Sequence, residues 1–272
     1  MTLEQKVAGL FFVTPEQLTG VSQVVAAGDA TRESLEKYPV GGLIYFAQNI
    51  QSENQLKEML SNTASYSLFP LFFGVDEEGG KVARVADALK LDKTLPMGEI
   101  GAAGDTQAAY DAYQNIGGYL SSYGFNVDFA PVADVLTNVD NTVIGNRAFS
   151  SDAGVAAQMV SSAVTGLQET GVSACLKHFP GHSRGFSYRR GADGPDEGGD
   201  GSRGIFTVSV WHRSRCRYDY GRAYHSTEPD GWRFASCEYF RKNHYGSAAQ
   251  RIGLSGDYYY RCNEYGGDYR IL

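Results

Sequence analysis

The amino-acid composition changes abruptly after His182, and this change limits what the chain can fold into. Residues 1–182 hold sixteen Leu, seven Lys and three Arg, whereas residues 183–272 hold two Leu, one Lys, thirteen Arg and eleven of the eighteen Tyr. Leu, Ile and Val together number only seven in residues 183–272, which is too little apolar surface for an ordinary core. We therefore expect residues 1–182 to carry the fold and residues 183–272 to lack a native one.

Charge and cysteine spacing exclude several functions. The net charge of −7 does not favour nucleic-acid binding, which needs a basic face. The Arg residues of 183–272 are scattered among Gly and Tyr without a helical or strand period, which argues against an arm that binds polyanions. Cys175, Cys216, Cys237 and Cys262 show no CxxC spacing, so we expect no metal site and no cofactor. Cys175 lies in an apolar run and is predicted to be a buried core residue.

The sequence also bears on location. No stretch approaches the ~20 apolar residues that a membrane-spanning helix needs. The first residues, Met-Thr-Leu-Glu-Gln-Lys, do not resemble a signal peptide. The expected location is therefore the cytoplasm, or outside the cell if Met1 is an internal start that follows a leader.

Apolar runs alternate with helical patterns through residues 1–182, which is typical of parallel βα units. The predicted strands are residues 10–13, 42–46, 71–76, 127–131 and 174–178, and their continuous hydrophobicity suits strands covered on both faces. The predicted helices are residues 34–37, 54–61, 106–123 and 151–170, with Gly171 ending the last. The length fits one (β/α) barrel or two small domains. We predict an α/β fold of the TIM-type (β/α)8 class with the first five βα units intact and an irregular C-terminal part.

Polar residues gather where these strands end. The run Asp76-Glu77-Glu78 follows the third strand, Asp134 follows the fourth, and Lys177-His178 ends the fifth. A single ionisable residue at a strand end would more simply be leaving the core for solvent. Because the carboxyl ends of all strands in a parallel barrel share one rim, polar residues at several ends favour a functional site there.

Five segments carry a specific family resemblance. Residues 74–84 (Gly-Val-Asp-Glu-Glu-Gly-Gly-Lys-Val-Ala-Arg), 126–135 (Asn-Val-Asp-Phe-Ala-Pro-Val-Ala-Asp-Val) and 177–182 (Lys-His-Phe-Pro-Gly-His) resemble glycoside hydrolase family 3, within its β-N-acetylhexosaminidase branch. Residues 40–46 and 145–149 match in the same order. The resemblance covers nearly all of residues 3–182, and five ordered segments are far more specific than a lone Asp-Glu-Glu-Gly-Gly.

The resemblance implies a barrel that hydrolyses terminal β-linked N-acetylglucosamine from saccharides with retention, often in peptidoglycan recycling. It also implies that five residues bind the terminal sugar: Asp76, Arg84, Arg147, Lys177 and His178. These residue types suit a sugar, because a carboxylate accepts hydrogen bonds from hydroxyls while Arg and Lys donate charge-assisted ones. Lys177 could instead be an ordinary paired lysine, and His178 a core histidine. Glu77 and Glu78 are read as pocket support, and His182 as a residue that shapes the following loop.

Retaining hydrolysis needs a nucleophilic carboxylate and a proton donor. In this branch they belong to an Ile-Thr-Asp-Ala-Met-like motif and an Asp-Ser-His loop, and residues 183–272 contain neither, so no catalytic residue is assigned. A one-nucleotide shift explains the loss: codons for residues 257–262 then permit Ile-Ile-Ile-Thr-Asp-Ala, and codons for residues 185–193 permit Asp-Ser-His. We therefore hypothesise a frameshifted translation from near Ser183 and a chain that is inactive as written. The alternatives are a non-catalytic sugar-binding remnant and a genuine second domain, which the composition of residues 183–272 disfavours.

Overall fold

A five-stranded parallel sheet forms the centre of the computed structural model, which describes residues 1–178, 223–225 and 232–234. The strands, in spatial order, are β1 (Phe12–Val13), β2 (Gly42–Tyr45), β3 (Phe72–Val75), β6 (Val127–Asp128) and β7 (Ser173–Ala174). Each strand pairs in parallel with the next one along the sheet. This sequential order is the one that successive βα units of a barrel produce.

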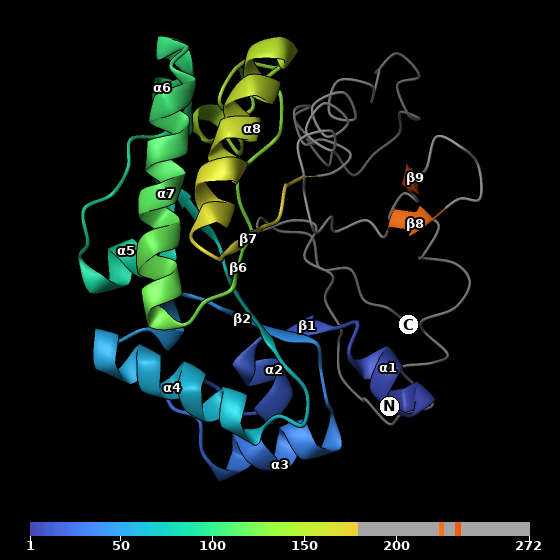
Figure 1. Ribbon diagram of the computed structural model, residues 1–272. Coiled ribbons are helices and arrows are strands. Elements are labelled where there is room, and N and C mark those ends of the chain that lie inside the picture. Colours follow the sequence, from blue (N-terminus) through green and yellow to red (C-terminus); the bar gives the residue numbers. More distant parts are fainter. Residues whose placement is uncertain (179–222, 226–231, 235–272) are drawn as a thin grey trace, which may run out of the picture.

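Helices connect the strands and pack against the sheet (Figure 1). After α1 (Leu3–Ala8), they are α2 (Pro15–Thr19), α3 (Asp29–Lys37), α4 (Glu53–Tyr66), α5 (Arg84–Leu89), α6 (Met97–Ala103), α7 (Thr106–Tyr123) and α8 (Ala153–Glu169). Two 3₁₀ turns, Ala47–Asn49 and Gly145–Arg147, follow β2 and β6. An antiparallel hairpin of β4 (Glu77–Gly79) and β5 (Val82–Ala83) follows β3 directly. This hairpin therefore stands at the carboxyl end of the sheet.

Local sequence signals set the ends of the long helices. The Ser52 hydroxyl accepts a hydrogen bond from the backbone of Gln55 at the start of α4, and Asp105 and Asp152 cap α7 and α8 in the same way. Such caps satisfy backbone N–H groups that have no partner within the helix. Gly171, with a φ of 88°, follows the end of α8. A left-handed residue at this point ends a helix, and glycine adopts it without steric cost.

The sheet has an apolar cluster on each face. The larger cluster joins the sheet to the helices, and its fully buried members include Tyr113 and Leu120 of α7. The smaller one contains only strand residues or residues that follow a strand directly: Phe12, Ile44, Phe72, Val127, Phe129 and Cys175. Successive residues of a strand point to opposite faces, so this second cluster is the inner face of the barrel sheet. Cys175 is buried there, as predicted.

The fold class predicted from sequence is confirmed, and the helix at residues 106–123 has the predicted bounds. All five strands are shorter than predicted, and the predictions at residues 10–13, 127–131 and 174–178 differ most. The first two contain only the two-residue strands β1 and β6, and β7 begins one residue earlier than predicted and ends at Ala174. One cause is Pro131, which has no N–H to donate to a ladder. The proposed frameshifted segment 183–272 lies outside the described residues. The exceptions are β8 (Ala223–His225) and β9 (Trp232–Phe234), which pair antiparallel.

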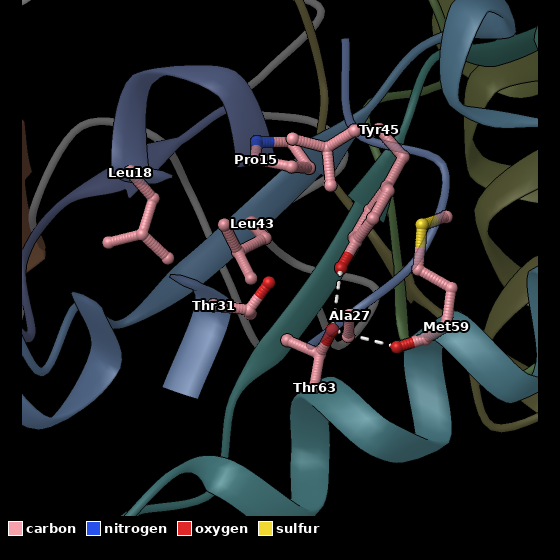
Figure 2. Close-up of a pocket in the computed structure, with 9 residues that line it drawn as sticks. Pro15, Leu18, Ala27, Thr31, Leu43, Tyr45, Met59 and Thr63 are labelled. Atoms are coloured by element: carbon pink, nitrogen blue, oxygen red, sulfur yellow. Dashed lines mark hydrogen bonds between the residues drawn. The ribbon is translucent and has the colours of Figure 1, made fainter. Parts of the chain in front are cut away.

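A small cavity lies among α2, α3, α4 and β2 (Figure 2). Apolar side chains form most of its wall, among them Leu18, Leu43 and Met59. Its polar atoms already bond to one another, since the Tyr45 hydroxyl lies 3.5 Å from Thr63 Oγ1, which donates to the Met59 carbonyl at 2.7 Å. The cavity is therefore a feature of the core and not a candidate site.

Close packing of α7 and α8 yields a first prediction. A Cβ atom on Gly166 would lie 2.2 Å from the Tyr110 carbonyl oxygen, so Gly166→Ala must push the helices apart. We expect a loss of about 1–3 kcal/mol in the free energy of unfolding, although Ala favours a helix. Gly118→Ala is the control, because nothing lies within 4 Å of its added Cβ and it should gain up to about 1 kcal/mol. Urea denaturation followed by circular dichroism measures both, and equal effects would contradict the prediction.

Candidate active site

Lys177 joins the ends of two strands that lie far apart in sequence. Its ammonium group lies 2.5 Å from Asp76 Oδ1 and 2.5 Å from Glu78 Oε1. Asp76 follows β3 directly, and Lys177 lies beyond β7, where it forms an isolated parallel bridge with Val132. The two carboxylates thus fix a lysine at the carboxyl end of the sheet.

Glu78 also binds Arg147 through two parallel hydrogen bonds. Arg147 Nε donates to Glu78 Oε2 and Arg147 Nη2 donates to Oε1, both at 2.7 Å. The side chains of Arg147 and Glu78 are only 3% and 1% exposed. The 3₁₀ turn Gly145–Arg147 supplies the arginine, whose Nη1 also donates to the Val143 carbonyl at 3.2 Å. A bidentate pair of this kind is strong and fixes orientation as well as distance.

His178 is oriented by Asp134. The His178 Nδ1 atom and its backbone N–H lie 2.7 and 3.1 Å from Asp134 Oδ2, and Asp134 is buried. The carboxylate directs the other ring nitrogen, Nε2, toward Arg147, whose Nη2 lies 3.5 Å away. A histidine held at one nitrogen presents the other in a fixed direction. Asp76, Glu78, Asp134, Arg147, Lys177 and His178 together form what we term the charged network.

The charges of this network determine the ionisation of its members. Burial alone would raise the pKa of Glu78, but Lys177 and Arg147 outweigh it and lower that pKa to about 2. Burial would lower the pKa of Lys177, but Asp76 and Glu78 raise it well above its ordinary value. Glu78 is therefore a carboxylate and Lys177 an ammonium ion throughout the physiological pH range. The negative charge of Glu78 therefore lies between two positive charges, those of Lys177 and Arg147.

Glu77 points away from the charged network, and its carboxylate binds the first turn of α5. Its carboxylate accepts hydrogen bonds from the backbone N–H groups of Val85 and Ala86 at 2.7 and 3.0 Å, and from the Tyr119 hydroxyl at 2.7 Å. Glu77 and Glu78 are adjacent residues of β4, and adjacent strand residues point to opposite sides. Burial raises the pKa of Glu77.

The structure brings four of the five predicted sugar-binding residues into one hydrogen-bonded network: Asp76, Arg147, Lys177 and His178. Arg84 is the first residue of α5 and is half-buried. His182 lies outside the described residues. Within the part of the chain that the structure describes, no group of His, Cys, Asp or Glu is placed to hold a metal ion. None of the helices described there is long and apolar enough to cross a membrane.

The sequence analysis did not single out Asp128 as a candidate. It is fully buried on β6, and its Oδ1 accepts the backbone N–H of Glu77 at 2.9 Å. The alternation Val127-Asp128-Phe129 was the available signal, because it places Asp128 on the opposite face from its two apolar neighbours.

A parallel βα sheet whose strand ends carry paired carboxylate, lysine and arginine side chains is typical of barrel enzymes, whose active sites lie at this end. Residues 2–194 match the family described as "Glycosyl hydrolase family 3 N terminal domain". The chain therefore belongs to glycosyl hydrolase family 3, as the sequence resemblance indicated, and its five-stranded parallel sheet is part of a TIM-type (β/α)8 barrel.

Individual relatives agree with this assignment. The chain is 40% identical over 159 residues to "Beta-hexosaminidase A" of Pseudoalteromonas piscicida, covering 55% of this chain and 26% of the relative. It is 35% identical over 160 residues to a "Beta-hexosaminidase" of Thiobacillus denitrificans, covering 57% and 44%. A solved family 3 beta-N-acetylglucosaminidase from Paenibacillus sp. superposes with a TM-score of 0.62 at 34% identity, covering 67% of this chain and 34% of that one. The chain thus spans less than half the length of these three proteins.

The depressed pKa of Glu78 leads to a pH prediction. The stability that Glu78 contributes is present above its ordinary pKa of 4.5 and is lost as the pH falls toward about 2. Glu78→Gln should therefore lower the free energy of unfolding by about 3–5 kcal/mol at pH 7, with a difference that shrinks below pH 4.5. Urea denaturation across this range measures it, with the exposed Glu58→Gln as control. A difference between wild type and Glu78→Gln that does not change with pH would contradict the assignment.

Proposed function

We propose that this chain carries the sugar-recognition half of a retaining β-N-acetylhexosaminidase, and that residues 1–178 bind the terminal N-acetylglucosamine of a β-linked saccharide. The observation that carries the proposal is Lys177 held between Asp76 and Glu78 at the carboxyl end of the sheet. The names of the relatives, which are hexosaminidases of the same family, support it.

Side-chain exposure distinguishes the residues of the charged network that can contact a sugar from those that support them. Asp76, Lys177 and His178 retain 8%, 15% and 20% exposure, so their polar atoms can meet a ligand. Asp76 then accepts a hydrogen bond from one sugar hydroxyl while Lys177 donates to another, and both bonds are charge-assisted. Arg147 and Glu78 have almost no exposed surface. In this proposal they do not contact the sugar and instead hold Lys177 and His178 in place.

Cleavage of the glycosidic bond requires groups other than these sugar-binding residues. The reaction needs a carboxylate that attacks the anomeric carbon and a group that protonates the leaving oxygen. Residues 183–272 as written contain neither the Asp-Ser-His motif nor the Thr-Asp-Ala motif that the family resemblance leads us to expect. We therefore propose that the chain as written binds the sugar without cleaving it, and that the reading frame changes near Ser183.

A non-catalytic sugar-binding protein is the second candidate function. It is favoured by one observation: the ion pairs of Glu78 with Arg147 and Lys177, of Asp76 with Lys177, and of Asp134 with His178 all lie within residues 76–178. Recognition can therefore persist where catalysis is lost.

Calorimetric titration with N-acetylglucosamine tests the binding proposal. The chain as written should bind the sugar, and Asp76→Asn should weaken binding by about tenfold, because a charge-assisted acceptor becomes a neutral amide. Asp92→Asn, at an exposed position, is the matched control and should leave affinity unchanged. Equal affinity of wild type and Asp76→Asn would remove Asp76 from the site.

A chromogenic β-N-acetylglucosaminide tests the catalytic half of the proposal. The chain as written should show no turnover above background, whereas a chain whose gene is shifted by one nucleotide after the codon of His182 should hydrolyse the substrate. A lost proton donor alone typically costs 10²–10⁴-fold, and the written frame also lacks the nucleophile. Turnover by the written chain would refute the frameshift proposal, and inactivity of both chains would count against the proposed reaction.

A further inference from the structure

Glu77 is a buried carboxylate that the proposed sugar contacts leave unused. It is fully buried and accepts three hydrogen bonds, two from the first turn of α5 and one from Tyr119 of α7. A buried carboxylate is costly unless such donors surround it. The carboxyl group of Glu77 is therefore buried directly beside Asp76 and Glu78, two residues of the charged network.

Glu77 contacts the backbone on both sides of Arg84. On one side, the backbone of Glu77 pairs with Ala83 in the β4–β5 ladder. On the other side, its carboxylate binds the N–H groups of Val85 and Ala86. Arg84 lies between these contacts, so Glu77 holds the backbone on both sides of it.

Asp128 fixes Glu77 in turn. Asp128 Oδ1 accepts the backbone N–H of Glu77 at 2.9 Å, across the edge between β3 and β6. The residues before and after Glu77 are Asp76 and Glu78, the two carboxylates that hold Lys177. A second brace comes from α7, where the Tyr113 hydroxyl donates to the Glu78 carbonyl at 3.1 Å.

We propose that Glu77 is a positioning residue of the sugar site: Asp128 anchors its backbone between Asp76 and Glu78, and its carboxylate sets the direction from which Arg84 reaches the sugar. This inference rests on the proposed sugar site. It makes one buried side chain a link between Arg84 and the two carboxylates that hold Lys177.

The contact that Asp128 makes with Glu77 needs only an oxygen acceptor at Oδ1. Burial, and next the nearby Glu77 charge, raise its pKa well above the ordinary value, although the Glu77 N–H opposes this. Its Oδ2 is buried and has no hydrogen-bond partner among the described residues. A carboxamide has nearly the shape of a carboxyl group and keeps the Oδ1 acceptor. Asp128→Asn should therefore retain wild-type sugar affinity, whereas Asp128→Ala should weaken it.

Amide hydrogen exchange tests the anchoring directly and without sugar. In Glu77→Gln, a carboxamide replaces one acceptor by a donor that faces a backbone N–H, so Val85 or Ala86 should exchange about tenfold faster. The Val155 amide, capped by Asp152 in α8, is the internal control and should not change. Tyr119→Phe removes only the hydroxyl contact and should leave the Val85 and Ala86 rates near those of wild type. Unchanged exchange of both amides in Glu77→Gln would overturn the proposal.

A double-mutant cycle with Arg84 then separates positioning from general damage to the fold. Glu77→Gln and Arg84→Ala should each weaken N-acetylglucosamine binding by about tenfold, and the double variant should bind no more weakly than Arg84→Ala. Additive losses would show that Glu77 does not act through Arg84 and would overturn the proposal. If the wild-type chain itself fails to bind the sugar, the proposed function falls, while the exchange rates still decide whether Glu77 holds α5.

Discussion

The carboxylate of Glu78 is the interaction on which the rest of the site depends. It accepts two hydrogen bonds from Arg147 and lies 2.5 Å from the Lys177 ammonium group. Removing these charges from water is costly, and their mutual attraction offsets that cost only when every partner is in place. Three separate segments, β4, the 3₁₀ turn Gly145–Arg147 and the end of β7, must therefore close on the same carboxylate. A defect in any of them leaves a buried charge without its partner.

The sheet and its polar edge could be predicted from sequence because they depend on regular patterns. Continuous apolar runs predicted the five strands, and the helical period predicted α7 with the bounds that the structure has. Parallel topology then required the residues after β3, β6 and β7 to meet at one edge. Asp76 and Lys177, which are 101 residues apart, do meet there.

The different roles of Glu77 and Glu78 could not be predicted, because the two side chains are identical and adjacent. Their directions depend on β4, a three-residue strand that ends at Gly79 and is too short to show a period. Arg147 was equally inaccessible to pattern reasoning. It lies 69 residues from Glu78 in a single 3₁₀ turn, so only the family resemblance identified it as a candidate.

The charged network is also compact along the chain. Its first member is Asp76 and its last is His178, and both partners of the ion pairs that hold Glu78 and Lys177 lie within this range. During synthesis, proteins begin to fold from the N-terminal side. A nascent polypeptide that has emerged from the ribosome as far as residue 178 already carries every charge that Glu78 must meet. The ion pairs of Glu78 can therefore form co-translationally, before the residues that follow have emerged from the ribosome.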